Sequence, residues 1–508
     1  MARSPVAIAV GAALALLTLG TALVVLAQGH LHLTAPDWAA VRFTLLQAAL
    51  SAFVSTALAI PIARALARRR FTGRGLLIIL MGAPFLLPVI VAILGLLAVF
   101  GRAGILNQTL QSAGLPAIQI YGLHGVVLAH VFLNLPLATR MILQGWQAIP
   151  AERLRLAASL GFPPTAVARH LEIPMLRAVL PGAAVTIFVI CLTSFAVALT
   201  LGGGPRATTV ELAIYQALRF DYDLGRAATL AAVQFALCAI TALVAWRMIQ
   251  PSGFGAGLDR GYIFAPTGWR RIADTAAITL AAVFLLIPLA SIVTQGLIGL
   301  PQIPPSIWPA ALRSVSIAIP SALLSTAAAL ALALAVARGT SRWLDLAALL
   351  PLATSGLVLG TGLFLTLQPW VAPATVALPV TLLVNAALAL PFVYRLLLPE
   401  AQALHRDYAR LTQSLNLHGP TALILVTLPR LARPLGFGAG VALALSMGDL
   451  GVIALFASDA QATLPLAIQR LAGAYRMDAA AGASLVLITI SFTLFALCDY
   501  GGRRVAPD

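Results

Sequence analysis

The chain contains RLAASLGFPPTAVARHLEIP at residues 155–174 and, 255 residues later, RLTQSLNLHGPTALILVTLP at residues 410–429. Both stretches are polar, whereas most of the chain is apolar. Each begins with a helix-forming run, passes through a turn signal and ends a second short run at a proline. Ser or Thr before a helical run and Pro at its end are typical start and stop signals. Each stretch therefore predicts a short helix, a turn and a second short helix.

The composition around these stretches is that of an integral membrane protein. Of 508 residues, 60% are hydrophobic and 9% are charged, against about a quarter charged in soluble proteins. All 32 basic residues are arginine, so a phosphate-binding P-loop, which needs a lysine, is excluded. The three cysteines and seven scattered histidines have no metal-site spacing. We expect no metal site, no bound cofactor and no catalytic residues, and any ATP would be hydrolysed by another chain.

The apolar runs predict twelve membrane-spanning helices, since about 20 apolar residues cross the hydrocarbon core. The first run is too long for the apolar part of a signal peptide, so it is counted as a span. The runs lie near 6–27, 41–66, 76–100, 123–145, 179–201, 227–249, 275–298, 311–336, 344–367, 373–397, 434–457 and 480–499. With a cytoplasmic N-terminus, 24 of the 32 arginines face the cytoplasm, as the positive-inside rule requires. Both termini and both opening stretches are then expected to be cytoplasmic.

Aligned polar residues show that the chain is a tandem duplication. At a displacement of 255 the matches are Pro136 with Pro391, Arg140 with Arg395, Arg155 with Arg410, Ser159 with Ser414, Pro174 with Pro429, Val197 with Val452, and Asp223 with Asp478. Further upstream a displacement of 270 matches Trp38 with Trp308, Ser55 and Thr56 with Ser325 and Thr326, and Arg68 with Arg338. Apolar runs align trivially, but aligned Arg, Pro, Ser and Asp do not.

The duplication predicts two six-span units, residues 1–250 and 251–508. Because six is even, both units have the same orientation and can face each other about an axis along the membrane normal. Each unit carries its polar loop, near 150–178 or 400–433, at the cytoplasmic face. Two matched surface loops are what a membrane channel needs if a pair of soluble motor subunits drives it.

The loops resemble the EAA loop of permease subunits of bacterial ABC importers, in which Pro follows Gly by thirteen residues. Gly161 and Pro174 keep this spacing, and in the second copy Asn416 replaces the glycine while Pro429 remains. Asn tolerates the left-handed backbone that Gly usually supplies. The acidic residue of the motif falls on Arg155 and Arg410, so its contact cannot be carried over. The resemblance implies that Arg155, Ala157, Ser159, Gly161, Pro174, Arg410, Ser414, Asn416 and Pro429 belong to loops that couple the chain to an ATPase.

Over nearly its whole length the chain is similar to the fused two-domain permeases of thiamine and thiamine pyrophosphate importers. The stretches that carry the similarity are residues 66–77, 121–144, 201–231 and 443–458. The fused permease of ferric-iron importers shares the twelve-span plan and is the alternative. The resemblance implies an all-α, type I ABC importer permease in the bacterial inner membrane. It also implies two copies of a cytoplasmic ATPase that hold ATP and Mg²⁺, a periplasmic binding protein that delivers the cargo, and no nucleic-acid partner.

Few polar groups lie at membrane depth, where an ionisable side chain indicates function. Asp449 is the clearest, and its counterpart in the repeat is Ser194. A carboxylate there could meet the cationic thiazolium ring of thiamine. The competing interpretation is that Asp449 caps a helix broken between Gly448 and Gly451.

The outer segments 202–223 and 458–478 are too short to span the membrane and predict re-entrant or interfacial helices. Asp223 and Asp478 are expected to cap the spans that follow. An ion-coupled secondary transporter, the alternative class, would usually place several coupling carboxylates at mid-membrane. A membrane-embedded enzyme would need a paired acid and base or a ligand set, which the spans lack.

Overall fold

The computed structural model describes residues 5–30, 32–81, 87–204, 207–248, 268–339, 342–417 and 419–505, and its regular secondary structure is helical. Eleven helices of these residues are long and apolar enough to cross a membrane. A twelfth span is formed if Trp343–Ala353 and Gly356–Leu367, which meet at an angle of 92°, count as one. The predicted all-α, twelve-span membrane fold is thus confirmed. The boundary predicted at residue 250 lies outside the described residues.

The first half is composed of long helices joined by short ones. They are α1 (Pro5–Ala15), η1 (Leu16–Gly20), α2 (Thr21–Gln28), α3 (Ala35–Arg68), α4 (Arg74–Leu80), α6 (Val89–Phe100), α7 (Ile105–Ser112), α8 (Leu123–Gln147), α9 (Ala151–Ser159), α10 (Pro164–Val167), η2 (Ala168–Glu172), α11 (Ile173–Leu192), α12 (Ala196–Leu201), α13 (Val210–Arg219) and α14 (Leu224–Met248).

The second half repeats this order of long and short helices. It comprises α15 (Trp269–Gly299), η4 (Leu300–Gln302), α16 (Ile307–Ala337), α17 (Arg342–Leu349), η5 (Leu350–Ala353), α18 (Gly356–Leu367), η6 (Pro373–Val376), α19 (Ala377–Ser414), α20 (Gly419–Ala422), η7 (Leu423–Thr427), α21 (Leu428–Met447), α22 (Gly451–Phe456), η8 (Asp459–Gln461), α23 (Leu464–Gly473) and α24 (Met477–Val505).

The duplication is visible in the helix bounds themselves. The π-helical turns η2 and η7, the helices α11 and α21, and the short helices α12 and α22 all begin 255 residues apart. Beyond them the register shortens, because Tyr222 and Tyr475, both with positive φ (53° and 60°), are 253 residues apart. The predicted equivalence of Asp223 and Asp478 is therefore wrong. Asp223 Oδ1 accepts a hydrogen bond from Arg226 N at the start of α14, as the predicted cap should.

Several predicted spans are broken rather than continuous. The run 76–100 is divided between α4 and α6, and the run 179–201 between α11 and α12. The same break recurs at residues 448–450, between α21 and α22. Breaks at membrane depth are tolerated where protein buries them, and the helices after these breaks lie in the apolar core.

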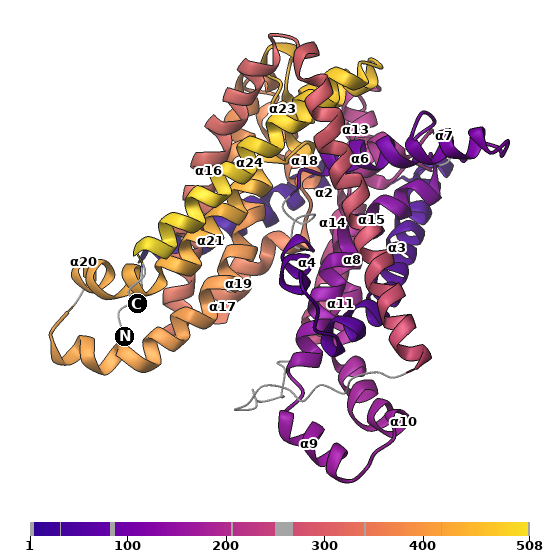
Figure 1. Ribbon diagram of the computed structural model, residues 1–508. Helices are drawn as coiled ribbons and strands as arrows, with labels where there is room; N and C mark the ends of the chain where they lie inside the picture. Colours follow the sequence, from indigo (N-terminus) through magenta and orange to yellow (C-terminus); the bar gives the residue numbers. More distant parts are fainter. Residues whose placement is uncertain are drawn as a thin grey trace.

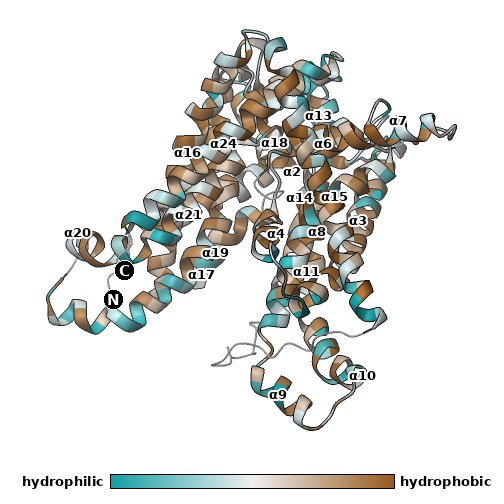
Figure 2. Cartoon of the chain, in the orientation of Figure 1, coloured by the Kyte–Doolittle hydropathy of each residue, from teal (hydrophilic) through white to brown (hydrophobic). Residues whose placement is uncertain are grey.

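The two halves exchange their first helices. Figure 1 shows the first-half helices α3, α8, α11 and α14 on one side and the second-half helices α16, α19, α21 and α24 on the other. Helices α1 and α2 pack against α16, α17 and α18 of the second half, while α15 packs against α3 and α6 of the first. The hydropathy colouring is brown along the long helices and bluer around the loops at the lower end (Figure 2). The halves are therefore interlocked through their first helices.

Glycine permits both crossings. A Cβ atom at Gly362 of α18 would lie 2.5 Å from Thr21 Cβ, and one at Gly95 of α6 would lie 2.6 Å from Ile292 Cγ1. Gly95 and Gly362 occupy the same position of the helices α6 and α18. Small residues at such points let helices approach closely within a membrane.

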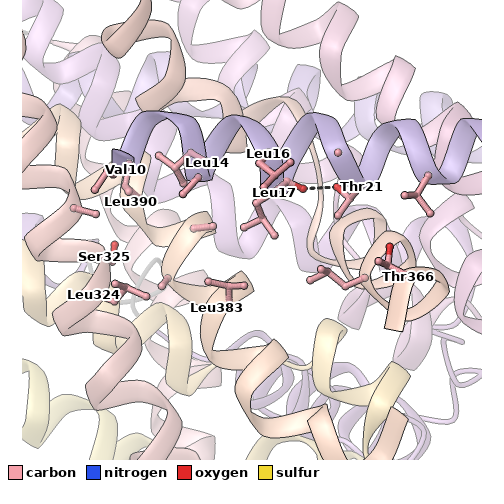
Figure 3. Close-up of a pocket in the computed structure, with 17 residues that line it drawn as sticks. Val10, Leu14, Leu16, Leu17, Thr21, Leu324, Ser325, Thr366, Leu383 and Leu390 are labelled. Carbon is pink, nitrogen blue, oxygen red and sulfur yellow. Dashed lines mark hydrogen bonds between the residues drawn. The ribbon is translucent and has the colours of Figure 1, made fainter. Parts of the chain in front are cut away.

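Each exchanged helix leaves an apolar cavity beside it. One, of about 590 Å³, lies between α1–α2 and the helices α16, α18 and α19 (Figure 3). Its counterpart, of about 940 Å³, lies between α15 and the helices α3 and α8. The hydroxyls of Thr21 and Thr366 in the first cavity donate to carbonyls of their own helices, at 2.6 and 2.7 Å. Such lining fits hydrocarbon chains better than a polar cargo.

Replacing Gly362 by Val should displace α2 and destabilise the protein. The added methyl groups have no space beside Thr21, and overpacking of this kind costs about 1–3 kcal/mol. The measurement is the thermal unfolding midpoint of detergent-purified protein. Gly473→Ala is the control, because nothing lies within 4 Å of a Cβ atom there. Equal midpoints for the two variants would contradict the proposed role of the crossing.

Candidate functional site

The first polar loop contains the predicted short helix, α9, and a left-handed turn. The prediction of a second short helix that ends at Pro174 is wrong, because α10, η2 and α11 follow one another without a gap from Pro164 to Leu192 and the π-helical turn η2 carries the helix past the proline. Gly161 has φ +66°, and the N–H of Phe162 donates to Ala157 O at 2.9 Å, which closes the end of α9. This pattern of a left-handed residue followed by a back-donated N–H is a common helix stop. Ala157 is buried, whereas Arg155 and Ser159 are exposed.

The second polar loop has the same turn, with asparagine in place of glycine. Asn416 has φ +50°, and the N–H of Leu417 donates to Thr412 O at 2.9 Å. The expectation that Asn would adopt the left-handed conformation is confirmed. Arg410 and Ser414 are exposed, and Ser159 and Ser414 each donate to the carbonyl three residues earlier at 2.9 Å.

The two loops differ in how they join the preceding span. In the first half the helix stops at Gln147, and α9 starts after Pro150, which lies at its N-cap. In the second half α19 continues for 38 residues to Ser414. Proline lacks the N–H that a continuing helix needs, and the residue equivalent to Pro150 is His405.

Each loop exposes a matched pair of leucines. Leu156 and Leu160 are 59% and 60% exposed, and Leu411 and Leu415 are 50% and 59% exposed. Each pair is spaced i, i+4 and so lies on one helix face. Both loops lie at the lower end of the molecule in Figure 1. Each loop thus exposes one apolar contact point next to polar residues, and the two points are equivalent.

An ion-pair cluster, here called the Glu172 clamp, ties the first loop to α3. Glu172, at the end of η2 and 7% exposed, contacts Arg64 Nη2 at 2.7 Å and Arg68 Nη2 at 2.5 Å. The equivalent second-half residues are Thr427, Leu334 and Arg338, so the second loop cannot form this clamp. It is held instead by Arg430, whose guanidinium lies 5.0 Å from the Tyr408 ring centre.

The helix breaks of both halves meet in one apolar core. Phe195, Leu357 and Val452, from both halves, belong to the same cluster of buried residues. A Cβ atom at Gly451 would lie 2.7 Å from Leu357 Cδ1 and 3.9 Å from Phe195 Cδ1. Arg219 also crosses between the halves, donating to Ala457 O at 3.1 Å.

Ser194 and Asp449 both occupy these breaks and are half-buried. Asp449 Oδ1 accepts a hydrogen bond from Gly451 N at 3.2 Å, so the side chain caps α22. Its Oδ2 atom is buried and has no hydrogen-bond partner among the residues that the structure describes. Ser194 N donates to Cys191 O at 3.4 Å. Capping therefore uses one carboxylate oxygen and leaves the other unpaired.

Another buried carboxyl group, Glu211 on α13, was not singled out from the sequence. It is 0% exposed, and burial raises the pKa of Glu211 to about 8, with Ser355 and Gln234 close enough to lower it in part. The α13 helix and its partner α23 are the predicted short, non-spanning helices of the segments 202–223 and 458–478. The available signal was a single acidic residue inside an otherwise apolar helical run, TVELAI.

Known proteins match the chain over most of its length. The thiamine transport system permease protein ThiP of Salmonella typhimurium is 39% identical over 491 residues, covering 93% of this chain and 90% of the relative. The chain belongs to the thiamine transport system permease family. The ThiP proteins of Brucella abortus and Haemophilus influenzae are 38% and 34% identical, covering 91% and 90% of this chain and 87% of each relative. No protein-family model matches the chain.

Membership of this permease family establishes the general class of the protein, a transport permease. A sulfate transport system permease protein, CysW of Synechococcus elongatus, is also 30% identical over 122 residues, 24% of this chain. The chain is a multi-pass permease component of an ABC transport system rather than an enzyme. The ferric-iron alternative is not favoured, because these relatives, which cover nine-tenths of the chain or more, are thiamine permeases.

Glu172→Thr, which installs the residue of the second half, should loosen the first loop. Two arginines lose their charged partner, and hydrogen bonds to charged groups contribute about 1.5–3 kcal/mol. Hydrogen–deuterium exchange should accelerate at residues 161–172 and remain unchanged at residues 419–427. The exposed Glu152 provides the control variant Glu152→Thr. Unchanged protection of residues 161–172 would show that the clamp does not hold the loop.

Proposed function

We propose that this chain forms the translocation pathway for thiamine or its phosphate esters in an ATP-driven importer of the bacterial inner membrane. The observation that carries the proposal is similarity to thiamine permeases over nine-tenths of the chain. A periplasmic binding protein delivers the cargo. Both chain ends face the cytoplasm, which agrees with the arginine distribution.

The two polar loops are the docking sites for two copies of a cytoplasmic ATPase. Their support is the matched geometry: the same left-handed turn at Gly161 and Asn416 and the same exposed leucine pair in each loop. The prolines Pro174 and Pro429 start the helices α11 and α21 at equivalent positions. Movement of a docked loop is thereby passed to the span that leads directly to a helix break. ATP and Mg²⁺ belong to the ATPase subunits.

The pathway runs through the core where the helix breaks meet, and Asp449 is its cation contact. The unpaired Oδ2 atom of Asp449 can accept the thiazolium cation when the halves separate. Ser194, at the equivalent position of the first half, places no second negative charge opposite it, and two like charges would repel strongly in a low dielectric. The buried backbone around both breaks excludes water until the halves move.

The test is ATP-dependent uptake of labelled thiamine by vesicles that contain this chain with its ATPase and binding protein. Asp449→Asn should reduce uptake at least about tenfold, because Asn retains the helix cap but removes the charge. The exposed Asp478 gives the control variant Asp478→Asn, expected to transport normally. Uptake driven by an ion gradient without ATP would refute the importer mechanism.

Gly161→Val and Asn416→Val should uncouple ATP hydrolysis from transport. A β-branched residue resists positive φ, so the turn would open and the docked helix would shift. The measured quantity is the number of ATP molecules hydrolysed per thiamine imported, which should rise severalfold in either variant. Asn416→Gly is the matched control and should keep the normal ratio. A normal ratio in both valine variants would remove the coupling role of the loops.

A further inference from the structure

Three buried polar residues lie together where the two halves meet. Glu211 on α13 and Gln234 on α14 come from the first half, and Ser355 at the N-cap of α18 comes from the second. Both carboxyl oxygens of Glu211 and the Oε1 atom of Gln234 have no hydrogen-bond partner among the described residues. All three side chains are almost fully buried, with exposures of 0%, 0% and 2%.

The cluster is anchored to the irregular backbone of both halves. Gln234 Nε2 donates to Leu192 O at 3.0 Å, at the break that follows α11. Ser355 Oγ accepts from Val358 N at 3.1 Å, at the 92° bend that precedes α18. The carboxyl group of Glu211 lies beside both side chains. Any movement that separates the halves at this bend therefore opens the cluster.

The repeat shows that the fold does not require this polarity. The residues at the equivalent positions of the other half are Pro465, Leu487 and Pro88, and all three are buried. The same packing is thus made with apolar side chains on one side and with unpaired polar ones on the other. A buried polar group without a partner costs about 1–3 kcal/mol, so the polar version needs a compensating function.

The chemistry of the cluster selects the ligand. Among the described residues, the two carboxyl oxygens of Glu211 and the Oε1 atom of Gln234 have no hydrogen-bond partner, whereas the amide N–H groups of Gln234 donate to Leu192 O and Cys238 Sγ. An acceptor-rich site binds a group that supplies N–H donors or positive charge, and it rejects a group that presents another oxygen acceptor. In a site of this kind, loss of one hydrogen bond leaves a buried group unpaired, which makes the discrimination strong.

We propose that Glu211, Gln234 and Ser355 form a cargo-recognition site for an amino-substituted heteroaromatic ring, exposed when α13 and α14 separate from α18. The site rests on the proposed function, since thiamine carries an aminopyrimidine ring besides its thiazolium cation. Asp449 takes the cationic ring, and Glu211 accepts a hydrogen bond from the amino group of the other ring.

The experiment compares the transport of thiamine with that of an analogue whose pyrimidine amino group is replaced by a carbonyl oxygen. Wild-type, Glu211→Gln and Glu211→Leu chains are reconstituted with the ATPase and the binding protein. The readout is kcat/KM for transport of thiamine divided by kcat/KM for transport of the analogue. Each cargo is added directly, and the binding protein is present at a saturating concentration. The wild-type ratio should be at least about tenfold. In Glu211→Gln it should fall to about one, because the new amide group donates to the analogue.

Glu211→Leu separates recognition from folding. It imitates the apolar side of the repeat, so it should assemble with the ATPase, keep its thermal stability and lose thiamine uptake at least tenfold. Should this variant fail to fold, the selectivity ratio of Glu211→Gln still decides. If the ratio is unchanged in Glu211→Gln while wild-type uptake is normal, the assignment of Glu211 is overturned but the proposed function is not. Absence of thiamine uptake by the wild type would instead reject the proposed function, and this inference with it.

Discussion

The crossing of each half's first helix onto the opposite half is the contact on which the rest of the structure depends. Thr21 rests against Gly362, and Ile292 rests against Gly95, so neither half is complete without a helix of the other. Within a bilayer, where apolar surface gains nothing from leaving lipid, such close packing is the main source of cohesion. The exchange holds the halves together at the crossings.

The helix breaks create both the need for burial and the opportunity for chemistry. Backbone groups released at residues 193–195 and 448–450 would be costly in lipid, and the joint core of the two halves shields them. The same shielding keeps Asp449 and Glu211 away from water. Unpaired oxygens discriminate most strongly between ligands when water is excluded. Each buried carboxyl group lies in one half only, since its counterpart is Ser194 or Pro465. The two halves thus share one fold, and differences at single positions place each buried carboxyl group in one half only.

Features that depend on local chemistry could be predicted from the sequence. The turn at Asn416 could be predicted because few residues other than Gly and Asn accept positive φ. The lengths of the helices beside it could not, because α19 reaches Ser414 as one 38-residue helix and the helix that starts at Gly419 continues into α21. The exchange of α1 and α15 could not, because an apolar helix carries no mark of which apolar surface it meets. The 92° bend before Ser355 and the two-residue loss of register before Tyr475 are likewise set by tertiary packing. Glu211 was overlooked because part of its environment, Ser355, comes from the other half, more than a hundred positions away.

One last consequence arises from the unequal lengths of α8 and α19. Helix α19 runs for 38 residues, about 57 Å, from its exposed tip past Asn385, whose amide donates to Ser446 Oγ at 3.1 Å near the second break. Pro391 and Pro399 lie inside it, so it is continuous from the loop to the core but can bend at the prolines. The first half has a joint at Pro150 and a strut from Glu172 to α3. Equal movements of the two loops would therefore reach the helix breaks by different structural routes. The two halves would then respond unequally to the same displacement of their loops.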